Sequence, residues 1–199
     1  MSSYTIPSVI ERTTGGGERT ADIFSRLLSD RIIYLGTEVD DGVANTVIAQ
    51  VLHLENESRD APIQMYLNSA GGDVQAVLAI HDALAYVRSP IAVTCVGQVV
   101  AAPVLLLAAG TPGMRAVLPH SRAVLRPLEA SGRGAIPDLI LAVEEVERVR
   151  RQLERLLAEA TGRDAVQVRQ DLERERVLDA AAIVDYGLAD EILLRRPTA

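Results

Sequence analysis

From Arg31 onward, short apolar runs alternate with segments whose apolar residues recur every three or four positions. Runs rich in Val, Ile and Leu predict strands over residues 32–35, 63–67, 91–96, 115–118 and 122–125. The helical spacing predicts helices over 44–54, 74–87 and 101–109. The expected inward face of the first helix carries Val47, Ile48, Val51 and Leu52. This alternation is typical of right-handed βαβ units, so we expect an α/β fold around a largely parallel sheet.

A long charged helix is predicted over residues 138–160, after a Gly-containing break at 129–137. Apolar residues repeat along one side of it, opposite a face of Glu and Arg: Ile140, Val143, Val146, Val149, Leu153 and Leu156. We interpret it as a projecting helix whose apolar stripe is open to a neighbouring subunit. The alternative is a helix packed back on its own sheet. A short helix over 164–172 and a strand at 192–194 complete the predicted elements.

Composition narrows the classes of function. The chain is 48% hydrophobic and 24% charged, which is ordinary globular usage. Aromatic residues make up only 3%, and the net charge is −7, so the sequence predicts no nucleic-acid partner. Cys95 is the only cysteine, which excludes an intrachain disulfide and a multi-cysteine zinc site. We expect neither a metal nor another cofactor.

No segment has the pattern of a signal peptide or a membrane span. Residues 1–20 are polar and Gly-bearing, without a basic start and an apolar run. The longest apolar stretches, such as 99–109, are about half the ~20 residues that a spanning helix needs. The sequence therefore predicts a cytoplasmic protein without a membrane partner.

Several motifs resemble one known protein family in their order and spacing. Near the N-terminus these are Ile10-Glu11-Arg12-Thr13, Asp22-Ile23-Phe24-Ser25-Arg26-Leu27-Leu28 and Arg31-Ile32-Ile33. Further along they are Tyr66-Leu67-Asn68-Ser69-Ala70-Gly71-Gly72, Cys95-Val96-Gly97-Gln98, Leu118-Pro119-His120-Ser121-Arg122 and Tyr186-Gly187-Leu188-Ala189-Asp190. Across essentially its whole length, the chain resembles the proteolytic subunit of the ATP-dependent Clp protease (caseinolytic protease P).

The resemblance implies an α/β, ClpP/crotonase-like fold of repeated βαβ units with a projecting handle helix. It implies one domain over 1–199, divided into an axial N-terminal segment (1–25), a head (26–126 and 164–199) and a handle (127–163). Members of the family are serine peptidases that form seven-membered rings. Two rings stack through the handle, and a Clp ATPase feeds unfolded polypeptide into the particle.

The resemblance places the three positions of the family's Ser-His-Asp triad at Ala101, Arg126 and Glu175. An alanine side chain has no atom that can attack a carbonyl carbon. A guanidinium stays protonated and has no acceptor lone pair, so Arg126 cannot act as a general base. Glu175 keeps a carboxylate but moves it by one methylene. We therefore expect a catalytically degenerate member of the family.

The oxyanion hole depends on the backbone rather than on side chains. The resemblance assigns it to the N–H groups of Gly72 and Ala102. Pro103 stands where the family usually has Gly, within the first turn of the predicted helix at 101–109, where a missing N–H is tolerated. We expect the helix to be kept.

No other side chain supplies a replacement triad. His53 and His81 fall on helices away from the site, and His120 and Ser121 are consecutive residues whose side chains point apart. Cys95 is interpreted as a buried core thiol rather than a nucleophile. Ser69 is expected to form hydrogen bonds within the Gly-Gly loop.

Assembly features are better retained than catalytic ones. The resemblance assigns a ring contact to Glu173 and Arg174, for which the alternative is a solvated charge run at a helix end. We hypothesise that Arg126 and Glu175 form an ion pair across the altered site.

The family's ATPase-docking pocket is only partly retained. Its apolar character is carried by Tyr66, Tyr86, Leu118 and Leu193. Gln64 and Ala116 stand where the family often has aromatic residues, so the hydrophobic anchor should be weaker.

These observations favour an inactive Clp proteolytic-subunit homologue that assembles into rings as a structural or regulatory subunit, alone or with an active paralogue and a Clp ATPase. One alternative is a working endopeptidase that uses a partner ring or an unrecognised nucleophile. Another is a non-proteolytic, crotonase-like enzyme that uses the remaining oxyanion hole. A last alternative is a decoy that binds a Clp ATPase or an anti-Clp compound.

Overall fold

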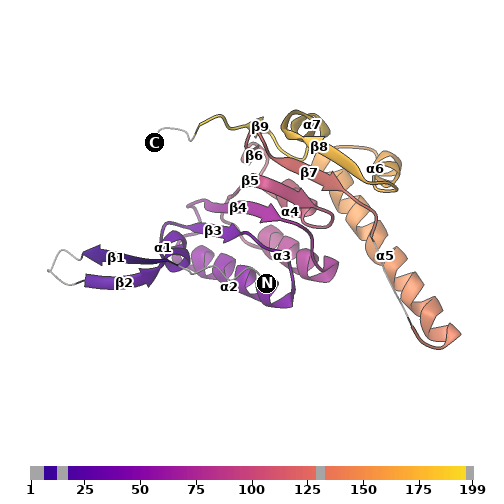
Figure 1. Cartoon of the computed structure of the whole chain (residues 1–199), viewed down its shortest axis with the longest axis horizontal. Helices are drawn as coiled ribbons and strands as arrows, with labels where there is room; N and C mark the ends of the chain where they lie inside the picture. The colour runs from indigo at the N-terminus through magenta and orange to yellow at the C-terminus, as the bar shows by residue number, and fades with distance from the viewer. Residues whose placement is uncertain (1–6, 13–17, 129–132, 196–199) are drawn as a thin grey trace.

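The computed structural model describes residues 7–12, 18–128 and 133–195. Parts of the expected axial segment (1–6 and 13–17), of the handle (129–132) and of the C-terminus (196–199) lie outside this range. Figure 1 shows a mixed α/β architecture in which strands and helices alternate along the chain. The strands are β1 (Ser8–Arg12), β2 (Glu18–Asp22), β3 (Ile32–Leu35), β4 (Ile63–Ser69), β5 (Ile91–Val100), β6 (Arg115–Val117), β7 (Arg122–Leu125), β8 (Arg176–Asp179) and β9 (Glu191–Ile192). The helices are α1 (Ile23–Ser29), α2 (Asp41–Glu57), α3 (Val74–Tyr86), α4 (Val104–Ala108), α5 (Ile136–Thr161), α6 (Ala165–Asp171) and α7 (Ala180–Tyr186).

The predicted parallel sheet is confirmed. Strands β3, β4, β5, β6 and β9 lie side by side in that order and are all parallel. β7 pairs in parallel with the far end of β5, and β8 pairs antiparallel with β7. A separate antiparallel hairpin of β1 and β2 precedes α1 and extends away from the sheet (Figure 1).

Aspartates start most of the helices. The residue before the first turn is Asp22 in α1, Asp40 in α2, Asp73 in α3, Asp164 in α6 and Asp179 in α7. Each carboxylate accepts hydrogen bonds from backbone N–H groups that have no partner inside the helix. These short-range signals fix where the chain leaves each strand and enters the following helix.

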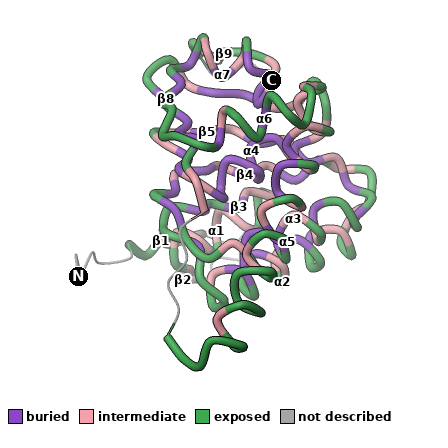
Figure 2. Tube along the Cα trace, turned by 90° about the vertical axis from the view of Figure 1, so that its right-hand side faces the viewer, coloured by how far each residue is buried: buried purple, intermediate pink, exposed green. Residues whose placement is uncertain are grey.

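The core lies between the sheet and a helical layer in which α2 contacts α3, α3 contacts α4, and α4 contacts α5. On β4 and β5, alternate residues are fully buried while those between them are half-buried. The buried positions gather where the strands face the helices (Figure 2). The helical layer therefore covers one face of the central strands, and the other face stays partly open.

Helix α5 combines the two arrangements considered for the long helix. Its C-terminal half packs on the core through Val149, Leu153 and Leu157, which are at most 4% exposed. Its N-terminal half extends away from the sheet, as predicted (Figure 1). Ile140 and Val143 there are 54% and 60% exposed. None of the helices in the described residues combines the length and the hydropathy that a membrane span requires.

Two other details differ from the predictions. Leu52 of α2 is 43% exposed, whereas Leu54 is fully buried, so the inward face of this helix is rotated from the expected one. The helix expected at 101–109 begins at Val104, because residues 101–103 form a turn after β5, a strand that extends to Val100.

Candidate functional site

The turn between β5 and α4 holds Ala101 in a left-handed conformation, with a φ of 58°. This conformation is unfavourable for any residue with a Cβ atom. Hydrogen bonds on both sides fix it, because the Ala101 N–H donates to the carbonyl of Val124 (2.9 Å) and its carbonyl accepts from the N–H of Val104 (3.1 Å). The chain thus forms a sharp strand–turn–helix corner of the kind that exposes a nucleophile, but it presents a methyl group.

The two backbone donors predicted for an oxyanion hole follow the ends of neighbouring strands. Ser69 of β4 pairs with Val99 of β5, and Gly72 and Ala102 each lie three residues further along their own segments. Gly72 has a φ of 139°, and a Cβ at this position would lie 2.3 Å from the carbonyl oxygen of Val39, so only glycine fits. In the part of the chain that the structure describes, neither N–H donates a hydrogen bond.

The predicted ion pair between Arg126 and Glu175 is confirmed. Arg126 donates from Nε and Nη2 to the same oxygen, Oε2 of Glu175, at 3.1 and 2.7 Å. The two residues lie opposite each other just beyond the β7–β8 ladder, whose last pair is Leu125 and Arg176. Both side chains are about half exposed, at 43% and 53%. Positions separated by 49 residues along the chain are therefore joined by a cross-strand contact.

The histidines do not form a catalytic pair with the nearby hydroxyl. His120 is exposed, whereas Ser121 is buried and donates from Oγ to the carbonyl of Cys95 at 2.8 Å. His53 lies on the exposed side of α2. His81 is on α3, where its Nδ1 lies 3.3 Å from Oδ1 of Asp82.

The thiol and the loop serine behave as expected. Burial raises the pKa of the Cys95 thiol to about 11, so it is held as a neutral core group. Ser69 is buried, and its Oγ donates to the carbonyl of Gly71 at 3.0 Å. Both predictions are therefore confirmed.

The positions predicted for a ring contact, Glu173 and Arg174, are exposed in the turn between α6 and β8. Glu173 borders a charged hollow beside the middle of α5. At the bottom of this hollow, Glu154 is almost fully buried and accepts hydrogen bonds from Arg150 (2.7 Å) and Arg169 (3.0 Å). This network fastens α6 to α5 immediately before the exposed pair.

The open face of the sheet forms a cleft of about 620 Å³. Tyr66, Leu118 and Leu193 all line it, so the structure brings together three of the four residues predicted for docking. Tyr86 is not among the residues that line this cleft; it is 80% exposed at the end of α3. Gln64 and Ala116 also line the cleft, where aromatic residues would have made it more apolar.

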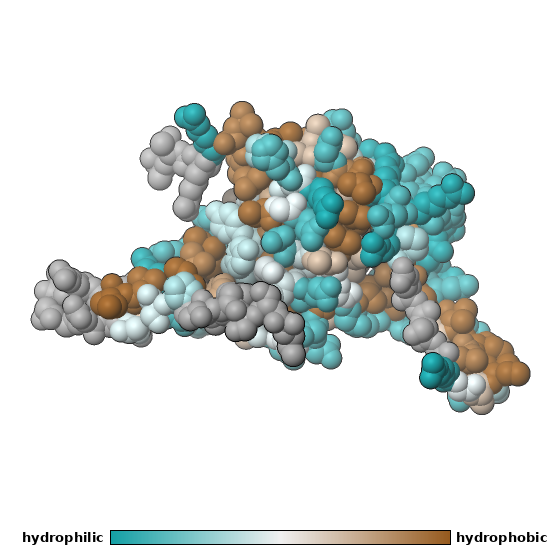
Figure 3. Space-filling view, viewed as in Figure 1, coloured by the Kyte–Doolittle hydropathy of each residue, from teal (hydrophilic) through white to brown (hydrophobic). Residues whose placement is uncertain are grey.

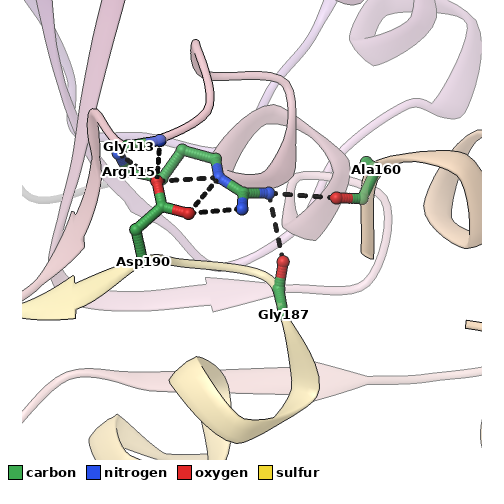
Figure 4. Close-up of polar contacts among 5 residues, drawn as sticks. All are labelled: Gly113, Arg115, Ala160, Gly187 and Asp190. Atoms are coloured by element: carbon green, nitrogen blue, oxygen red, sulfur yellow. Dashed lines mark hydrogen bonds and ion pairs between the residues drawn. The ribbon is translucent and has the colours of Figure 1, made fainter. Parts of the chain in front are cut away.

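A salt bridge that the sequence analysis did not single out holds one wall of the cleft in place. Arg115 on β6 pairs with Asp190, which directly precedes β9, and its Nη1 donates to the carbonyls of Ala160 and Gly187 at 3.1 Å (Figure 4). Asp190 also accepts the N–H groups of Gly113 (2.7 Å) and Arg115 (2.9 Å). The Arg115 guanidinium lowers the pKa of this carboxyl below its usual value. We call this set of contacts the Arg115–Asp190 clamp.

The clamp joins β6, β9, the C-terminal end of α5 and the turn after α7. The available signal was the position of Asp190 at the end of the Tyr186–Asp190 motif. Among the described residues, no group of three His, Cys, Asp or Glu side chains could hold a metal ion.

Comparison with known proteins agrees with this geometry. A family model described as Clp protease matches residues 15–196. The chain is 50% identical over 196 residues to the ATP-dependent Clp protease proteolytic subunit 1 of Nocardia farcinica, covering 98% of this chain and 100% of that protein. It is 51% identical over 193 residues to subunit 4 of Rhodococcus jostii (97% and 99%) and 49% identical over 197 residues to subunit 2 of Streptomyces avermitilis (98% of each). With a match over nearly its whole length, the chain belongs to the Clp protease family.

Proposed function

We propose that this chain is a catalytically silent homologue of the Clp proteolytic subunit, which assembles into rings and acts as a structural or regulatory subunit. The observation that carries the proposal is the pairing of Arg126 with Glu175 beside a corner that presents only the methyl group of Ala101. Peptide hydrolysis by the family requires a nucleophile, a base and an acid at these positions. None of the three keeps its original residue.

The chemical argument follows from what each side chain can do. Ala101 cannot form an acyl bond, so the first covalent step has no attacking atom. The Arg126 guanidinium directs its N–H groups at Glu175 and has no lone pair with which to accept a proton. The Glu175 carboxylate is correspondingly engaged by a permanent cation instead of orienting an imidazole. Backbone donors at Gly72 and Ala102 remain, but they stabilise an oxyanion only after an attack has occurred.

Assembly is supported by the apolar surface at the tip of α5. Ile136, Ile140, Leu141 and Val143 are between 54% and 75% exposed, and the brown surface at the lower right of Figure 3 belongs to this part of the molecule. A cluster of this kind is costly to leave in water. We assign it to contact between two stacked rings, with Glu173 and Arg174 as a further contact.

We infer the partners of this chain from its relatives, which are named as proteolytic subunits of an ATP-dependent protease. An active proteolytic paralogue would supply the chemistry in a mixed particle. A Clp ATPase would dock on the cleft lined by Tyr66, Leu118 and Leu193. The chain would then change the rate or the partner choice of the active subunit without cutting peptides itself.

Particle mass and peptide cleavage test this proposal together. Seven or fourteen copies of a 21.4-kDa chain would give a particle of about 150 or about 300 kDa. We expect such a particle without cleavage of a fluorogenic peptide, and we expect it to elute with the active paralogue and alter its rate. Cleavage by the purified chain alone would contradict the catalytic part. A monomer that neither elutes with the active paralogue nor changes its rate would contradict the proposed assembly.

A further inference from the structure

The cleft is one face of a parallel sheet that no helix of the described chain covers. Parallel sheets are usually buried on both faces. Here the strand residues that point into the helical layer are fully buried, whereas the alternate residues on β4 and β5 are only half-buried. A partner bound to this uncovered face would give the sheet a second covering layer, as parallel sheets usually have.

Four strands contribute one row of side chains across the cleft. Tyr66 on β4 pairs with Thr94 on β5, Thr94 pairs with Ala116 on β6, and Ala116 pairs with Glu191 on β9. All four residues line the cleft. Because strands in register place paired side chains about 5 Å apart, the row runs from an aromatic ring to a carboxylate across a small central residue.

Part of the lining of the cleft is polar rather than apolar. Tyr66 donates from its hydroxyl to Oε1 of Gln64 at 3.5 Å, which leaves the Gln64 amide NH₂ as a donor on the cleft side. Thr94 adds a hydroxyl in the next strand. These groups suit the backbone carbonyls of a bound peptide. Leu118 and Leu193, which follow β6 and β9, contribute aliphatic side chains to the cleft lining.

The electrostatic character of the cleft comes from Glu191. Among the described side chains that line the cleft, Glu191 alone carries a formal charge at neutral pH. Arg115, which precedes Ala116 on β6, is engaged in the Arg115–Asp190 clamp, where it pairs with the Asp190 carboxylate (Figure 4). The clamp also fixes β9 against β6, because the N–H groups of Gly113 and Arg115 both bind Asp190. Glu191 is therefore held at the rim of the cleft by the residue that precedes it.

We propose that this cleft selects a partner segment in which an aliphatic side chain is followed by a cationic one. The aliphatic side chain would contact Leu118 and Leu193, and the cationic group would pair with Glu191. The space left by Ala116 admits a long, thin side chain such as arginine across the row. This inference rests on the proposed function, in which the cleft is the docking surface, and it defines the chemistry of the partner that docks there.

Immobilised peptides provide the test. Three blocked peptides, Gly-Ser-Leu-X-Gly-Ser, would carry Arg, citrulline or Phe at X and would be measured by surface plasmon resonance with the assembled protein. Citrulline keeps the length and planar shape of the arginine side chain, but a carbonyl oxygen replaces one NH₂ group, so the charge and two of the five N–H donors are removed. We expect the Arg peptide to bind about fivefold more tightly than the citrulline peptide, from one partly exposed charge pair. The Phe peptide should bind least tightly.

Variants separate charge from shape. Glu191→Gln should remove the preference for Arg over citrulline, whereas the matched control Glu38→Gln, at an exposed residue outside the cleft, should keep it. Gln64→Tyr together with Ala116→Phe should reverse the order in favour of the Phe peptide. Particle mass is measured for each variant, so that a change in assembly is recognised.

The outcomes are distinguishable. Equal binding of the Arg and citrulline peptides, or tightest binding of the Phe peptide, overturns this inference while docking at the cleft stands. Binding of all three peptides that survives a Leu118→Asp substitution places them elsewhere and overturns it as well. Binding of none of the peptides contradicts both the inference and the assignment of the cleft as a docking surface.

Discussion

In the turn between β5 and α4, the side chain of Ala101 is only a methyl group. The φ of 58° at Ala101 is the conformation that a strained nucleophile turn imposes. An alanine does not gain from this conformation, yet the flanking hydrogen bonds to Val124 and Val104 maintain it. The proposed assignment of Ala101 to the nucleophile position therefore rests on a turn whose backbone is held in place while its side chain carries no reactive atom.

The strain at this residue predicts the sign of a stability change. Ala101→Gly should leave the free energy of unfolding unchanged or raise it by up to about 1 kcal/mol, because glycine adopts a positive φ without penalty. The control Ala108→Gly, in α4, should lower it by about 1 kcal/mol or more. Denaturant titration of both variants measures the difference. A clear loss of stability for Ala101→Gly would contradict the strained geometry.

Restoring the nucleophile alone should not restore catalysis. Ala101→Ser is expected to remain unlabelled by a fluorophosphonate and inactive on peptides, because Arg126 cannot deprotonate the hydroxyl. The double variant Ala101→Ser, Arg126→His supplies a base next to Glu175 and should react measurably. Peptide cleavage by the single variant would show that the base has been assigned to the wrong residue.

At the level of the secondary-structure elements, the Arg115–Asp190 clamp joins segments that are far apart along the chain. It connects β6, the C-terminal end of α5 and the turn after α7, and it lies directly before β9. Both side chains are largely buried, at 11% and 24% exposed. Loss of one partner leaves the other poorly solvated inside the protein.

Asp190→Asn should therefore lower the free energy of unfolding by about 2 kcal/mol or more at pH 7. Arg115 lowers the pKa of Asp190 in the folded state, so the carboxylate's contribution is fully present above the ordinary value of 3.8. It is lost as the pH falls through the lower folded value. Chemical denaturation at pH 7, 5 and 3 should show a constant gap between the native chain and the variant down to pH 5, and a smaller gap at pH 3. A gap that widens toward low pH would contradict this role.

Comparison of elements shows how far the sequence alone leads. The central strands are predictable because short apolar runs such as 91–96 are typical of buried strands. The prediction for β5 is too short, since this strand extends to Val100. α7 was missed although Asp179 and Gly187 mark its two ends, since its run of alanines carries little periodicity. β8 was also missed, because it exists only through pairing with β7. The hairpin of β1 and β2 and helix α1 were not predicted either.

The candidate site was predictable by a different route. The resemblance alone implies that Ala101, Arg126 and Glu175 stand at the family's triad positions, and this implied placement predicts the Arg126–Glu175 contact. The Arg115–Asp190 clamp joins residues 75 positions apart, and neither local pattern nor composition indicates such a pair. Tyr86 was grouped with the docking residues, but the fold leaves it outside the cleft lining.

At the scale of the whole molecule, the tip of α5 gathers several exposed apolar side chains on one short segment. Ile140→Glu should prevent ring stacking and halve the particle mass, because each copy would bring a charge into an apolar contact. The control Ala142→Glu adds the same charge on another side of the helix and should keep the mass. Analytical ultracentrifugation checks both variants. Equal particle masses for Ile140→Glu and the native chain would show that the tip of α5 takes no part in the proposed contact between rings.

Catalytic silence is the central claim for the assembled particle, and one measurement addresses it most directly. The native protein, alone and mixed with its active paralogue, would be incubated with a fluorophosphonate and examined by intact-mass spectrometry. We predict an adduct on the active paralogue and none on this chain in either sample. An adduct on this chain would contradict the account built on Ala101 and Arg126, and its position would identify the nucleophile.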